Sequence, residues 1–145
     1  MALVTNIVAA EEDEVEAVGQ SDRPVDEWSG LEARDIDSTK LATLHCLLSG
    51  DDLEEALGAY EPVYDALDDD GAIVVRIPTS IAERLAELEE ESLEEIGAEL
   101  AATEEFELDG WPVEDVQALL VAMGDLARLA EAQGQVMLAW MYPLP

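Results

Sequence analysis

The clearest hydrophobic pattern in the chain lies between residues 109 and 143. Its first part has apolar residues at spacings of three and four, the period of a helix that packs a broad face against a core. These residues are Val113, Val116, Leu120, Met123, Ala127 and Ala130. Pro112 suits the start of a helix and Gly134 its end. The pattern predicts a long C-terminal helix over 112–133, followed by a buried apolar strand over 135–142.

Three other segments have the composition of strands. Residues 2–9 are mostly apolar, and residues 72–77 form a short run rich in β-branched side chains. Residues 62–67 can pair with 72–77 as a hairpin, and Pro62 suits an edge strand. We therefore expect a small mixed sheet of about three to four strands, near 2–9, 62–67, 72–77 and 135–142.

Helical patterns account for most of the remaining chain. The predicted helices lie near 11–18, 38–49, 53–59, 79–88 and 93–100. Asp37 or Ser38 is a suitable N-cap for the second of them, and Gly50 ends it. Between the helices we expect a surface loop over 19–30, a lead-in over 31–37 and a linker over 103–109. The fold class is therefore α+β, in one domain that spans residues 1–145.

Charge is the most unusual property of the composition. The chain has 36 acidic and 6 basic residues, a formal net charge of −30. Direct nucleic-acid binding is not expected, because phosphate contacts need clustered lysine and arginine. Anionic membranes are excluded as partners for the same reason. Three interpretations remain open: a solvated surface that keeps the protein soluble, adaptation to a salty cytoplasm, or a negative face that attracts a basic partner.

The location follows from a few further observations. Apolar runs are too short to cross a bilayer, and the N-terminal residues lack the basic segment of a signal peptide. Cys46 is the only cysteine, which excludes an internal disulfide and fits a reducing compartment. We therefore expect a cytoplasmic protein. The sequence does not indicate its oligomeric state.

The residue types needed for catalysis or metal binding are scarce. His45 is the only histidine and lies on the apolar face of its predicted helix, which favours a buried, hydrogen-bonded structural role. Cys46 is its neighbour in sequence, so the two side chains point in different directions. One histidine and one cysteine cannot supply a zinc site. The turn Asp68–Gly71 lacks the ligand spacing of a calcium-binding loop. We therefore predict no catalytic residues, no metal and no cofactor.

Two groups of residues are the best candidates for contact with a partner. Trp28, Arg34, Asp35 and Asp37 form the densest mixture of aromatic and charged side chains. Tryptophan and arginine are common in interface hot spots. His45 and Trp111 complete the candidate set. For Trp28 and Arg34 the alternative is structural: a lid over core side chains and a local ion pair.

Three motifs resemble those of the YfbM-like family of bacterial proteins of unknown function. They are Leu44–Gly50, which ends a helix with Leu-His; Val75–Pro78, a strand leading into a helix; and Gly110-Trp111 before a long helix and an apolar strand. The resemblance implies a compact α+β fold and a cytoplasmic bacterial protein, and it implies no reaction. The chain departs from the family pattern at Ser38, Thr39 and Leu41.

These observations lead to two hypotheses about function. The first is a non-enzymatic protein-interaction module, of the inhibitor or immunity type, whose acidic face binds a basic protein. The second is a small-molecule-binding or enzymatic domain whose pocket is formed by distant parts of the chain, with Trp28, Arg34, His45 and Trp111 as its predicted lining.

Overall fold

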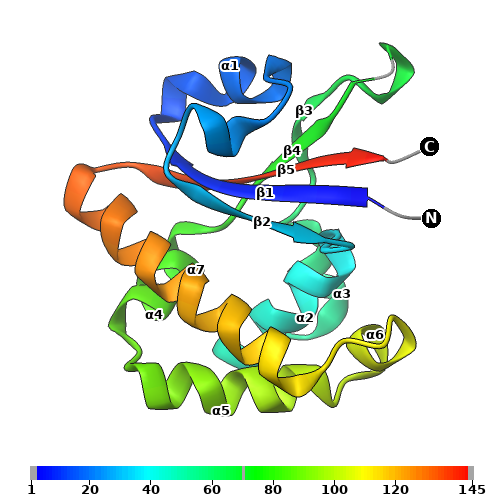
Figure 1. Ribbon diagram of the computed structural model, residues 1–145, viewed down its shortest axis with the longest axis vertical. Helices are drawn as coiled ribbons and strands as arrows, with labels where there is room; N and C mark the ends of the chain where they lie inside the picture. Colours follow the sequence, from blue (N-terminus) through cyan, green and yellow to red (C-terminus); the bar gives the residue numbers. More distant parts are fainter. Residues whose placement is uncertain (1–2, 70, 144–145) are drawn as a thin grey trace.

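The fold is built on a five-stranded sheet with the strand order β2-β1-β5-β4-β3. The computed structural model describes residues 3–69 and 71–143. Figure 1 shows helices α2 to α7 on one side of the sheet and the short helix α1 on the other. The strands are β1 (Leu3–Ala10), β2 (Gly30–Arg34), β3 (Pro62–Asp65), β4 (Ile73–Arg76) and β5 (Val136–Pro143).

Every pair of neighbouring strands is antiparallel, so the prediction of a mixed sheet was wrong. The prediction of three to four strands was also wrong, because it omitted β2. The four strands that were predicted are present, and β3 and β4 form the expected hairpin. β5 lies between β1 and β4, where it is covered on both faces, and this explains its continuous run of apolar residues.

The larger helical layer contains six helices over the described residues. They are α2 (Ser38–Ser49), α3 (Leu53–Gly58), α4 (Thr79–Glu87), α5 (Glu90–Ala101), α6 (Glu104–Leu108) and α7 (Val113–Gln133). The long C-terminal helix is confirmed as α7, which ends at Gly134 in a left-handed conformation (φ 67°). Asp37 caps α2 by accepting a hydrogen bond from the Lys40 N–H. Residues 103–109 are not a linker, because α6 lies within them.

The core between the sheet and these helices is formed by α7 and its neighbours. Leu120 and Met123 of α7 are fully buried, together with Leu85 of α4 and Leu93 of α5. α5 approaches α7 so closely that a Cβ atom at Gly97 would lie 2.7 Å from the Cα atom of Gln117. This contact fixes α7 firmly against the helical layer, and α7 in turn forms one wall of the surface described below.

The opposite face of the sheet is covered by a smaller layer. It consists of the 3₁₀ helix η1 (Glu12–Glu14), α1 (Val15–Gln20) and the 3₁₀ helix η2 (Pro24–Asp26). Val18 and Trp140 are buried between this layer and the sheet, and Trp28 packs at the margin of the same cluster. The acidic turn predicted at 68–71 includes Asp70, which lies outside the described residues. None of the helices in the described part is long and apolar enough to cross a membrane.

Candidate protein-interaction surface

Strand β2 forms one edge of the sheet, and three of its residues direct their backbone groups away from the sheet. Ala9 N–H donates to Ser29 O, and Asp35 N–H donates to Leu3 O, each at 2.9 Å. In an antiparallel pair, hydrogen-bonded residues alternate with residues whose backbone groups point outward. The register places Gly30, Glu32 and Arg34 in the outward set. Their N–H and C=O groups can pair with a further strand.

The two edges of the sheet differ in how well they could accept such a strand. β2 pairs with β1 in an unbroken register and contains no proline. β3, at the other edge, begins with Pro62, and its register shifts between Pro62 and Tyr64. Proline and irregular pairing are features that protect an edge from further pairing. Of the two edges, β2 is therefore the one that remains open to a partner strand.

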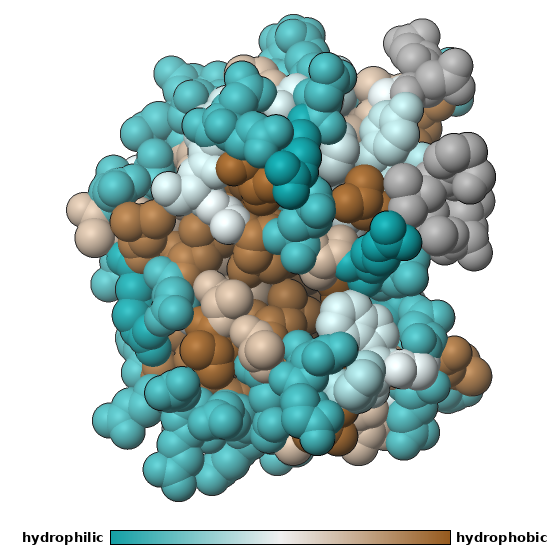
Figure 2. Space-filling view, viewed as in Figure 1, coloured by the Kyte–Doolittle hydropathy of each residue, from teal (hydrophilic) through white to brown (hydrophobic). Residues whose placement is uncertain are grey.

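An apolar groove lies beside this open edge, between β2 and α7. It consists of two adjoining hollows, about 320 and 260 Å³ in volume, which share Leu31 and Ala122. The apolar lining residues are Leu31, Ala33, Trp111, Ala118, Leu119, Ala122, Leu126 and Leu129. Figure 2 shows the corresponding hydrophobic area, with hydrophilic residues around it. We call this surface the β2–α7 groove.

The groove exists because the side chains that face β2 on this part of α7 are small. Ala118 and Ala122 are one turn apart on the helix and both line the hollows. A larger residue at either position would fill the space beside Leu31 and Ala33. The close packing of α7 against α5 holds the helix at this distance from β2. Asp115 of α7 also lines the groove and gives its border negative charge; Asp125 lines it too and pairs with Arg128 at 2.9 Å.

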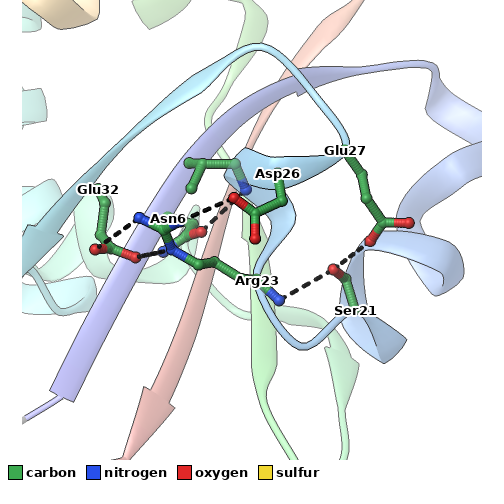
Figure 3. Close-up of polar contacts among 7 residues, drawn as sticks. Asn6, Ser21, Arg23, Asp26, Glu27 and Glu32 are labelled. Atoms are coloured by element: carbon green, nitrogen blue, oxygen red, sulfur yellow. Dashed lines mark hydrogen bonds and ion pairs between the residues drawn. The ribbon is translucent and has the colours of Figure 1, made fainter.

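A polar cluster on the other face of β2 holds the strand in place (Figure 3). Glu32 accepts hydrogen bonds from Asn6 Nδ2 at 3.2 Å and from Arg23 Nε at 3.1 Å. Arg23 also pairs with Asp26 at 2.8 Å, and Asn6 Oδ1 accepts from the Val25 N–H. The hydrogen bond from Arg23 is the main reason why the pKa of Glu32 lies below its usual range. Glu32 is therefore ionised at neutral pH, and it anchors β2 to the segment that contains Arg23.

The structure places three of the predicted partner-binding residues in or next to this surface. Trp111 lines the groove and packs edge-on against Phe106, with ring centroids 5.7 Å apart. Arg34 is exposed at the end of β2, and it forms no ion pair within the described residues. Asp35 follows β2 in a left-handed conformation (φ 57°), and its Oδ1 accepts a hydrogen bond from the Leu3 N–H. Asp35 thus helps to end the strand.

The other three predicted residues have local structural roles. Asp37 is the α2 N-cap. Trp28 lies against the cluster on the opposite face of the sheet, and its Nε1 donates to Glu14 Oε2 at 3.2 Å. Trp28 and Trp111 are therefore on opposite sides of the sheet. The pocket that was predicted to have Trp28, Arg34, His45 and Trp111 as its lining is not formed by the described residues.

His45 is buried and hydrogen-bonded, as its position on the apolar face of α2 predicted. Its Nδ1 lies 3.2 Å from the Tyr60 hydroxyl, and its Nε2 lies 3.0 Å from Asp51 Oδ2. Burial raises the pKa of Tyr60, so the hydroxyl stays protonated. Burial, assisted by the charges of Asp51 and Asp52, also raises the pKa of the Cys46 thiol, which disfavours the reactive thiolate. Both ring nitrogens of His45 are thus engaged by protein groups.

Comparison with known proteins gives one structural likeness. The chain is similar to a solved protein of unknown function, YfbM from Escherichia coli, with a TM-score of 0.47 and 14% sequence identity. The match covers 95% of this chain and 99% of the YfbM chain. The sequence motifs indicate a resemblance to the YfbM-like family, and the structural comparison finds a likeness to YfbM itself. No family model matches the chain, and no curated protein matches it. These comparisons assign no function.

Two further cavities lie away from the groove. One, of about 630 Å³, is lined by Arg76, Glu12 and Gln135 at the end of β4 and β5; Arg76 pairs with Glu12 at 2.9 Å. The other, of about 570 Å³, is lined by Trp140, Tyr142, Tyr64 and the loop after α1. Trp140 is 3% exposed, and its Nε1 has no hydrogen-bond partner among the described residues. The described residues contain no group of three metal-ligating side chains.

Most of the groove was not predicted from the sequence. Leu31 and Ala33 belong to a segment that was interpreted as a lead-in to α2, and Ala118 and Ala122 were not distinguished from other small residues of α7. The alternation of apolar residues with Glu32 and Arg34 is the one local signal for β2. The groove itself depends on contacts between segments that are far apart in the chain.

Proposed function

We propose that this chain is a non-enzymatic protein-interaction module of the inhibitor or immunity type, which binds a basic protein in the cytoplasm. The observation that carries the proposal is an apolar groove beside an unpaired edge strand on a molecule with a net charge of −30. An apolar centre with a charged rim is the usual arrangement of a specific protein interface. The sign of the charge indicates the sign of the partner.

Electrostatics supports a basic partner in two ways. The few cations of the chain are mostly neutralised internally, since Arg23, Lys40, Arg76 and Arg128 all form ion pairs with carboxylates. The remaining carboxylates therefore have few positive side chains near them, and their negative potential attracts an approaching basic molecule. A field of one sign increases the rate of encounter with a partner of the opposite sign, and salt weakens it.

The environment of the single histidine supports a role without catalysis. A general base needs a lone pair free to accept a substrate proton. His45 is buried, and Tyr60 and Asp51 occupy both of its nitrogens. Cys46 has a raised thiol pKa and is therefore a weak nucleophile at neutral pH.

Two matched double variants test the proposal. Glu114→Gln with Asp115→Asn removes two charges from the first turn of α7, beside the groove. Glu54→Gln with Glu55→Gln removes two charges from the first turn of α3, so the loss of helix-dipole stabilisation is similar. Tagged protein is used to capture partners from lysate of the source organism, and the captured basic protein is then purified. We expect the α7 variant to weaken its binding about tenfold and the α3 variant to have a much smaller effect.

The outcome that contradicts the proposal is also specific. If the two double variants weaken binding equally, the charge acts diffusely and the groove is not the site. If a captured protein is not basic, or binds the α7 variant as tightly as the parent chain, the electrostatic proposal is wrong. Measurement of the association rate at two salt concentrations separates long-range attraction from contacts within the interface.

The unpartnered indole N–H of Trp140 favours a second candidate function, the binding of a small molecule. A buried polar group without a partner is uncommon, and Trp140 lines a cavity of about 570 Å³ with Tyr64 and Tyr142. A ligand that reaches Nε1 would supply the hydrogen-bond acceptor that this buried atom lacks. Crystals of the protein purified from its source organism would show non-water density beside Nε1 if this function is correct. Water alone at that position would contradict it.

A further inference from the structure

We infer that an extended segment of the basic partner adds to the sheet as a new strand beside β2, with its apolar side chains in the β2–α7 groove. This inference rests on the proposed function and specifies how the partner is held. Recognition by strand addition combines backbone hydrogen bonds, which give affinity, with pockets for alternate side chains, which give specificity. Both components are present at this edge.

The backbone component comes from the outward residues of β2. Gly30, Glu32 and Arg34 direct their N–H and C=O groups away from β1. They occupy alternate positions, as the ladder of an antiparallel or parallel neighbour requires. Arg23 and Asn6 hold the Glu32 side chain, so the edge is fixed before a partner arrives. A preformed edge reduces the entropy lost on binding.

The side-chain component comes from the pleat of the added strand. Successive side chains of a strand point to opposite faces of the sheet. Those on the α7 side would lie beside Leu31 and Ala33, above the small residues Ala118 and Ala122. Those on the other side would lie beside Glu32 and Asp26, near the polar cluster. The site therefore fits a segment that alternates apolar and basic residues.

Charge selects this occupant over a second copy of the same chain. Edge strands often pair with themselves, which would join two sheets across β2. Here each copy has a net charge of −30, and Asp115 and Asp125 lie along the groove. Association of two such surfaces is opposed by repulsion between like charges. A cationic segment meets the same groove with attraction.

The experiment uses proline to remove one outward N–H without breaking the fold. Proline is tolerated on an edge strand where the N–H faces solvent. Glu32→Pro is compared with Glu32→Ala, which loses the same side-chain contacts but keeps the N–H. Arg34→Pro and Arg34→Ala provide a second pair if the first proline variant does not fold, as judged by circular dichroism. The probe is a synthetic peptide of alternating valine and lysine, long enough to cover β2.

Binding of the probe is measured by calorimetry near physiological salt. We expect the proline variant to bind at least about fivefold more weakly than its alanine counterpart, the loss of roughly one hydrogen bond.

A peptide of the same charge that alternates glycine and lysine should bind more weakly to all variants, since it lacks apolar side chains for the groove. Ala122→Arg should weaken binding of the valine peptide more than Ala132→Arg, which makes the same change at an exposed position of α7 outside the groove.

The outcomes separate this inference from the function on which it rests. Equal binding of both peptides, with no effect of proline, overturns strand addition and leaves a diffuse electrostatic interaction. A dimer of the chain alone that the proline variants disrupt overturns it in favour of a second copy. If the captured basic protein is sensitive to the α7 charge variant but not to proline at residue 32 or 34, the proposed function holds and strand addition fails.

Discussion

Replacement of Phe106 by alanine is expected to destabilise the protein by about 4 kcal/mol. Phe106 is 1% exposed and is the one buried residue of α6. Its ring packs edge-on against Trp111, and the Lys40 Nζ lies 5.7 Å from its centroid. Removal of the ring would leave a cavity beneath α6 and withdraw support from Trp111 at the end of the groove. Urea denaturation monitored by circular dichroism measures the change.

Leu108→Ala is the matched control, because Leu108 lies on the same short helix and is 78% exposed. It should change the free energy of unfolding by less than about 0.5 kcal/mol. Proteins of this size are stable by only about 5–15 kcal/mol, so the loss expected for Phe106→Ala is a large fraction of the total. If the two variants differ by less than about 1 kcal/mol, Phe106 is not the side chain that holds α6 to the core.

The parts of the fold that were predicted correctly have strong local signals. α7 has a long periodic pattern and a glycine at its end, so its bounds were predicted to within one residue at the N-terminus. β5 lies between two strands and is covered by helices on both faces of the sheet, so it has the continuous apolar run that such a position requires. Asp37 and Gly50 delimit α2 through hydrogen bonding and backbone conformation, both of which depend on residue type alone.

The parts that were missed are determined by contacts between distant segments. β2 has the sequence Gly-Leu-Glu-Ala-Arg, and its last four residues are good helix formers. Its pairing with β1 and the packing of Leu31 and Ala33 against α7 override that preference. α6 has five residues and one buried side chain, too short for a periodic signal. No local sequence pattern indicates that β5 runs antiparallel to its neighbours β1 and β4.

The candidate site shows the same division. Trp111 and Arg34 stand out by their residue types. Trp111 lines the β2–α7 groove, and Arg34 lies at the end of β2 on the other face of the strand. The groove also needs Leu31, Ala118 and Ala122, which are ordinary residues in sequence and become distinctive because α7 passes beside an edge strand. Trp28 and His45 were chosen for the same reasons as Trp111, but they serve the local structure.

Loss of the carboxylate at Asp109 is expected to be more damaging than loss of the cation that it pairs with. The side chain of Lys40 is 5% exposed, and its Nζ pairs with Asp109 Oδ2. Asp109→Asn would leave a buried ammonium group without its counter-ion, at a cost of about 2 kcal/mol after allowance for the exposure of Asp109. Lys40→Met removes the buried charge itself and keeps the apolar stem, so we expect a change of less than about 1 kcal/mol.

The double variant makes this asymmetry a test of mechanism. If the cost of Asp109→Asn comes from an uncompensated charge, then adding Lys40→Met should restore most of the lost stability. The double-mutant cycle, measured by urea denaturation, should therefore give an interaction energy of about 1–2 kcal/mol. Near-additive effects would show that the two side chains contribute separately. A loss for Lys40→Met as large as that for Asp109→Asn would mean that the ion pair stabilises the fold more than an apolar replacement can. Comparison of the free-energy losses for Asp109→Asn and Phe106→Ala then shows which contact holds α6 and the start of α7 near α2 more strongly: the Lys40–Asp109 pair or the buried ring of Phe106.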